Sequence, residues 1–181
     1  MKEEYTAYVL FVASLLCMKQ TASSGGKGRT MVSRFWLVAL RVSLGWVLLY
    51  AGLDKLFTEG GWSATGYLSH LEGPFASWFS WMAGNAAVDW LNMLGLTLVG
   101  LALVFGFFTR FSAFWGFVLM LFYYLSGYPF EHSFLIDEHV VYMLVFALFM
   151  AGGAGSVCGL DKLLISSAWA KDKRWIQLLA G

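Results

Sequence analysis

Ionisable side chains at the ends of two apolar segments are the residues of this chain most suited to chemistry. Asp54 and Lys55 end the first long apolar segment, and Asp137, Glu138 and His139 precede the last one. An imidazole and an ammonium group can bind an anion or hydrogen-bond a quinone carbonyl, and a carboxylate beside an imidazole can pass a proton. The competing interpretation is that charges at segment ends merely mark the boundary with water.

Two further polar residues lie inside apolar segments. Asn92 lies near the start of the second segment, where we expect it to join the charged residues in one pocket. Arg41 lies about seven residues into the first segment, roughly 10 Å from its cytoplasmic end at helical rise. Arg41 therefore has two interpretations, a snorkelling or paired structural residue and a ligand-binding one. Across the pocket, Glu138 or His139 is the expected partner of Lys55.

Long apolar helices must position these residues. The chain has 181 residues, of which 59% are hydrophobic and 13% charged, a composition typical of membrane proteins. Residues 90–109, 111–130 and 140–160 carry no charge, and residues 35–53 carry only Arg41. About 20 apolar residues match a hydrocarbon core of roughly 30 Å. We predict an all-α integral membrane protein, a four-helix bundle with spans near 34–57, 87–108, 110–127 and 138–157.

Charge placement predicts the topology. Lysines and arginines gather before the first span, between the second and third, and after the fourth, so both termini should face the cytoplasm across the cytoplasmic (inner) membrane. The connection 58–86 is rich in Trp, Tyr and Phe, and it reads as short amphipathic helices at the extracytoplasmic interface, either an anchor or a lid. Residues 1–32 are expected to be a flexible or interfacial extension, 33–160 the membrane domain, and 161–181 a cytoplasmic interfacial tail.

Several other functions are disfavoured. The net charge of +1 argues against a nucleic-acid partner. His70, His132 and His139 are the only histidines and all fall on the predicted outer side, which disfavours haem or metal, and no flavin site is evident. Cys17 and Cys158 form no CxxC motif, and Cys158 is expected to be a packed small side chain.

A set of motifs is spread over all four predicted spans: Arg41-Val-Ser-Leu-Gly45, Ala51-Gly-Leu-Asp-Lys55, Gly95, Gly100, Gly106, Thr109-Arg110, Asp137-Glu138-His139, Gly153-x-Gly155 and Gly159-Leu-Asp161. In these motifs the chain resembles the DoxX/DoxD-like membrane proteins over roughly residues 33–162. The resemblance implies a four-helix membrane domain and a role like that of the thiosulfate:quinone oxidoreductase large subunit, acting with a partner subunit.

Two functional hypotheses follow. In the first, the chain is an oxidoreductase subunit that passes electrons from thiosulfate, or a similar sulfur anion, to quinone. The catalytic residues would be Lys55, Glu138 and His139, and the substrate- or quinone-binding residues Arg41, Asp54, Asn92 and Asp137. In the second, it is a non-catalytic accessory subunit of a larger respiratory or photosynthetic membrane complex, packing on other subunits and lipid. A small-molecule transporter is a minor third interpretation, because no inverted repeat is visible.

Overall fold

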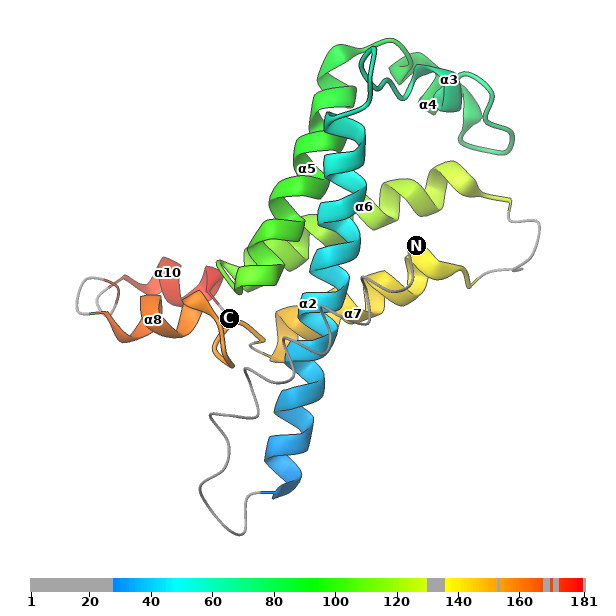
Figure 1. Cartoon of the computed structure of the whole chain (residues 1–181). Helices are drawn as coiled ribbons and strands as arrows, with labels where there is room; N and C mark the ends of the chain where they lie inside the picture. Colours follow the sequence, from blue (N-terminus) through cyan, green and yellow to red (C-terminus); the bar gives the residue numbers. More distant parts are fainter. Residues whose placement is uncertain (1–27, 130–135, 153, 168–169, 171–172, 181) are drawn as a thin grey trace.

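Every regular element in the described part of the chain is an α-helix. The computed structural model describes residues 28–129, 136–152, 154–167, 170 and 173–180 (Figure 1). The helices are, in order, α2 (Gly28–Leu56), α3 (Thr65–Leu68), α4 (Ala76–Met82), α5 (Ala86–Phe105), α6 (Thr109–Gly127), α7 (Glu138–Gly152), α8 (Leu160–Ser166) and α10 (Arg174–Leu179). The predicted all-α class is confirmed, and the four long helices lie where the sequence predicts spans. Most of the predicted N-terminal extension, residues 1–27, lies outside the described residues.

Two of these helices have the length and composition needed to cross a membrane. They are residues 34–56 of α2, with 23 residues, and α5, with 20. α7 is a shorter apolar helix. Large apolar side chains of α5 are exposed on the outside of the protein, among them Leu91, Leu94 and Leu98. An apolar outer surface is what a lipid-facing helix presents.

The long helices pack as two pairs. α2 lies along α5, and α6 lies along α7, while α5 and α6 are joined by a tight turn (Figure 1). Glycines allow the close approach within each pair, because a Cβ on Gly100 would overlap the backbone of Leu49, and one on Gly116 would lie 2.5 Å from the ring of Phe146. The shared core consists of Leu44, Leu48, Leu96, Val99, Leu103, Ala113, Met120, Phe146, Phe149 and Ala154.

The connection between α2 and α5 forms a small folded unit, which we call the α3–α4 cap (residues 57–85). It has its own buried core of Ala64, Leu68 and Phe79. The cap rests on the end of α6, where Trp78 stacks on Phe122 with ring centroids 5.8 Å apart. The two short helices predicted for this connection are present, and they cover the last turns of α6.

The C-terminal segment forms two short helices, α8 and α10, and α10 contacts α6. Ile176 of α10 is fully buried, so this segment packs on the helical body. Its predicted position at the membrane surface stays a prediction.

Candidate functional site at the cap side

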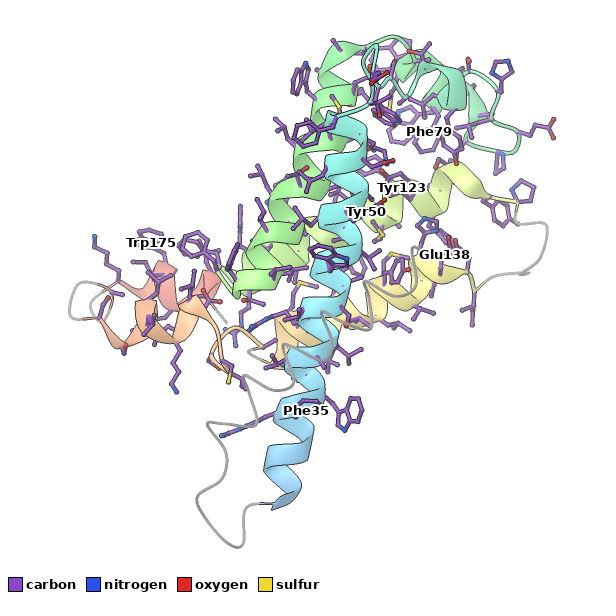
Figure 2. The ribbon with its side chains drawn as sticks, viewed as in Figure 1. Phe35, Tyr50, Phe79, Tyr123, Glu138 and Trp175 are labelled. Atoms are coloured by element: carbon purple, nitrogen blue, oxygen red, sulfur yellow. The ribbon has the colours of Figure 1, made fainter. Side chains whose placement is uncertain are left out.

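Three long helices contribute side chains to one polar cluster below the cap. We call it the cap-side cluster and define it as Asn92 of α5, Tyr123 of α6, and Asp137 and His139 at the start of α7. The hydroxyl of Tyr123 lies 2.7 Å from Nδ2 and 2.9 Å from Oδ1 of Asn92. The ring of Tyr123 stacks on that of His139, with centroids 5.7 Å apart. In the view of Figure 2, Tyr123 lies between Phe79 of the cap and Glu138 at the start of α7.

Asp137 holds the imidazole of His139. One carboxylate oxygen, Oδ2, lies 2.5 Å from Nδ1 of His139, and the other accepts a hydrogen bond from the backbone N–H of Val140 at 3.2 Å. The second contact is an N-cap, because a side-chain acceptor satisfies an N–H of the first turn of α7. With Nδ1–H donated to the carboxylate, Nε2 is the nitrogen of His139 that can meet a substrate. The side chain of His139 is 24% exposed and that of Asp137 is 11% exposed, so the pair is mostly buried but still accessible to a ligand.

The other predicted site residues near this end do not join the cluster. Lys55 places its ammonium over the ring of Trp62, 5.1 Å from the centroid, and Asp54 is exposed. Glu138 is exposed at the start of α7. The expected pairing of Lys55 with Glu138 or His139 is not formed among the described residues, since α7 packs chiefly on α6 and Lys55 turns towards the cap.

Arg41 lies at the opposite end of the molecule, fully buried. Its Nη1 donates to the carbonyl oxygen of Ala154 at 2.6 Å and more weakly to that of Val157 at 3.3 Å, and Nη2 donates to that of Cys158 at 2.8 Å. These carbonyls belong to the loop that follows α7, so the guanidinium stabilises a helix end that would otherwise leave acceptors unsatisfied. The contacts favour the structural interpretation of Arg41 over ligand binding.

Asp161, also fully buried, complements Arg41 at this end. Its carboxylate accepts hydrogen bonds from the backbone N–H groups of Phe108 at 2.6 Å and Thr109 at 2.9 Å, at the first turn of α6. The backbone N–H of Asp161 donates to the carbonyl of Gly106 at 2.8 Å. A carboxylate at a helix N-terminus is favoured by both the free N–H groups and the helix dipole. We call Arg41 and Asp161 with these contacts the turn-side clasp.

Sequence reasoning missed the structural role of Asp161 and the presence of Tyr123 in the cluster. In the sequence, Asp161 follows the charge-free residues 140–160 and is part of Gly159-Leu-Asp161. Its closeness to Gly155, where a Cβ would overlap the Asp161 carboxylate, is the signal that ties this glycine motif to the clasp. Tyr123 lies within the charge-free residues 111–130, and nothing in its sequence context indicates a polar neighbour.

The described residues hold no group of three or more His, Cys, Asp or Glu side chains arranged to bind a metal ion. His132 lies outside them. The expectation that Cys158 is packed is wrong, because its side chain is exposed. Its backbone has a positive φ of 52° and directs the carbonyl to Arg41, which turns the side chain outwards.

Comparison with known proteins identifies the family. The DoxX family model matches residues 36–129, which is more than half of the chain. The chain belongs to the DoxX family. This DoxX protein is a membrane protein, in agreement with its apolar helices. No curated protein and no solved structure matches it. The matched region includes Arg41, Asn92 and Tyr123 and ends before His139 and Asp161.

Proposed function

We propose that this DoxX protein is a membrane subunit of an oxidoreductase system that delivers electrons to quinone. In this proposal the cap-side cluster binds the quinone and exchanges its proton. The observation that carries it is the Asp137–His139 pair stacked on Tyr123, because it presents an oriented imidazole and a phenol at one place. Such groups can hydrogen-bond a carbonyl oxygen and transfer a proton to it.

Each residue of the cluster has a distinct role in this proposal. His139 donates a hydrogen bond from Nε2 when protonated, and Asp137 orients the ring through Nδ1. Tyr123 supplies a second hydrogen-bonding group, its hydroxyl, which accepts a hydrogen bond from Nδ2 of Asn92. Glu138, exposed one residue away, exchanges protons with the surroundings.

The electron donor we propose is thiosulfate or a related small sulfur anion, by resemblance to the DoxD-type proteins. Two thiosulfate ions lose one electron each and join through a new S–S bond to give tetrathionate. Quinone takes up these two electrons and two protons to give quinol. A partner subunit with its own redox cofactor would carry the electrons between them, because the protein supplies orientation and protons rather than a redox centre.

The orientation we propose has both termini in the cytoplasm and the α3–α4 cap on the other side of the cytoplasmic membrane. The distribution of lysine and arginine supports it. Labelling of Glu72→Cys, at an exposed position of the cap, by a membrane-impermeant thiol reagent in intact cells tests this orientation. Protection of residue 72 until the cells are lysed would contradict it.

Thiosulfate-dependent quinone reduction by the purified protein with its copurifying partners tests the function. The His139→Gln variant should lose at least about a hundredfold in turnover, the lower end of the range that a lost proton-transfer group costs. The matched control is His70→Gln, since His70 is an exposed histidine of the cap whose Nδ1 lies 2.8 Å from the carbonyl of Gly66. Equal turnover in the two variants would remove the cluster from the reaction.

A second candidate is the accessory subunit of a larger membrane complex. It is favoured by the use of Arg41, Asp161 and the glycines for packing rather than for binding. The His139→Gln variant separates the two functions. In an accessory subunit, it would leave both the turnover and the partner content of the complex unchanged.

A further inference from the structure

The charged side chains at the surface differ in sign between the two ends of the molecule. The carboxylates exposed at the cap end are Asp54, Glu59, Glu72 and Glu138. At the other end, around the α5–α6 turn and the starts of α8 and α10, the described charged side chains that reach the surface are Arg110, Lys162 and Lys173. The carboxylate of Asp161 at that end is fully buried. The turn end therefore presents positive charge.

Arg110, the second residue of α6, holds its charge without a partner in the protein. Its Nε is shielded from solvent and has no hydrogen-bond partner. In the part of the chain that the structure describes, no carboxylate pairs with its guanidinium. A guanidinium stays charged and carries five N–H donors, and donors left unpaired away from water cost free energy. The group is therefore suited to an acceptor that comes from outside the protein.

The clasp brings Lys162 to the same end as Arg110. The carboxylate of Asp161 accepts a hydrogen bond from the N–H of Thr109 at 2.9 Å, and Lys162 and Arg110 are the next residues along the chain on the two sides of this contact. Lys162 is exposed, and it too has no ion-pair partner among the described residues. Because Asp161 is buried between the two segments, it offers these cations no counter-charge at the surface.

Exposed apolar side chains accompany the two cations. Phe111 follows Arg110, Leu163 follows Lys162, and both are exposed. Trp175 of α10, a helix that packs on α6, is also exposed and lies beside the end of α5 in the view of Figure 2. Tryptophan prefers the boundary between lipid headgroups and acyl chains. Basic side chains next to exposed apolar ones are typical of surfaces that bind lipid at headgroup level.

The α5–α6 turn lies where a headgroup is available. α5 has the length and composition of a membrane-spanning helix, and it ends at Phe105, directly before the turn. The end of a helix that crosses the hydrocarbon core reaches the headgroup layer. α8 and α10 lie at this end of α5 in Figure 1, and Asp161 of α8 bonds to the turn itself. Both short helices are therefore at the same membrane surface.

We propose that this turn-side surface, formed by Arg110, Phe111, Lys162, Leu163 and Trp175, binds an anionic phospholipid of the adjacent leaflet. The guanidinium and the ammonium group donate hydrogen bonds to the phosphate, and the acyl chains lie against the apolar side chains. A zwitterionic headgroup carries a cation of its own, which the two basic side chains repel. Free phosphate would leave the apolar side chains uncovered. The binding is independent of the reaction proposed for the cap-side cluster, which lies at the other end.

Native mass spectrometry of the full chain measures this selectivity. The protein would be released from micelles that contain equal amounts of phosphatidylglycerol and phosphatidylcholine with the same acyl chains. The native protein should retain more phosphatidylglycerol. A basic side chain near an anionic lipid surface contributes about fivefold in binding, so Lys162→Gln should lower the ratio of the two retained lipids about fivefold.

The matched control is Lys55→Gln, which removes the same charge at the cap end, where the ammonium lies over the ring of Trp62. It should leave the ratio of the retained lipids unchanged. Lys162 is exposed, so its replacement leaves the core intact. Equal ratios in Lys162→Gln and Lys55→Gln would overturn the proposal.

Two further arms separate the residues and the ligand. Arg110→Gln should also lower the ratio about fivefold, and the Lys162→Gln result decides the test if the half-buried position 110 does not tolerate the change. Excess inorganic phosphate, at matched ionic strength, should not displace phosphatidylglycerol from the native protein. Displacement by phosphate would identify a simple anion site and overturn the assignment to a lipid.

Discussion

Replacement of Arg41 tests the turn-side clasp in depth. Arg41→Met keeps the alkyl stem but removes the donors to Ala154, Val157 and Cys158. Two of these hydrogen bonds are short, and a hydrogen bond to a charged group contributes about 1.5–3 kcal/mol. Removal of the buried charge recovers part of its desolvation cost. We expect a net loss of about 3 kcal/mol in the free energy of unfolding, or roughly a hundredfold in the equilibrium constant.

Reversible unfolding in mixed micelles, followed by far-ultraviolet circular dichroism, measures this loss. Arg34→Met is the matched control on the same helix, because Arg34 is exposed, and it should change stability by less than about 0.5 kcal/mol. Arg41→Lys should recover only part of the loss, since an ammonium group cannot reproduce the planar fork of the guanidinium. Equal stability of Arg41→Met and Arg34→Met would refute the clasp as a stabilising element.

Three further substitutions have definite expected outcomes. Asp161→Asn should lower the free energy of unfolding by about 2 kcal/mol in the same assay, because its amide N–H₂ would face a backbone N–H of Phe108 or Thr109. The control Asp54→Asn, at an exposed position, should leave stability unchanged, and an equally neutral Asp161→Asn would contradict the assigned capping. Gly100→Ala should destabilise the protein by about 1–3 kcal/mol by forcing α2 from α5, whereas Gly66→Ala, with open space around it, should not; similar stabilities would argue against the close approach. Tyr123→Phe should lower the free energy of unfolding by about 1 kcal/mol, because the contact with Asn92 is lost, and should slow quinone reduction. Tyr50→Phe, at an exposed position of α2, should leave stability and quinone reduction unchanged. Undiminished quinone reduction in Tyr123→Phe would count against the proposed role of Tyr123.

The apolar segments predicted the long helices well, because their length is set by a bilayer and their ends by single charges. The predicted fourth span ended at residue 157, but α7 ends at Gly152. The five residues beyond are apolar or small, yet Arg41 binds the carbonyls of Ala154 and Val157 in a loop, a tertiary effect that hydropathy does not contain. A continuous apolar run therefore overestimated this helix.

The sequence predicts at which end of the helices the candidate site lies, but not which side chains contact one another there. Counting residues from the segment ends correctly placed Asn92 and His139 at one end of the helices. Which helices touch depends on side-chain packing, such as Phe146 of α7 over Gly116 of α6, and this pairing brings His139 to Tyr123 rather than to Lys55. Hydropathy also treats a tyrosine in a span as apolar, so it does not reveal that the hydroxyl of Tyr123 contacts Asn92.

Equilibrium binding of a quinone with a decyl tail to the purified protein in nanodiscs tests the central claim most directly. The His139→Gln variant loses the hydrogen bond from Nε2 of His139, so its affinity for the quinone should fall about tenfold, whereas His70→Gln should bind the quinone as the native protein does. Identical affinities for the native protein and both variants would contradict the assignment of the cap-side cluster to quinone.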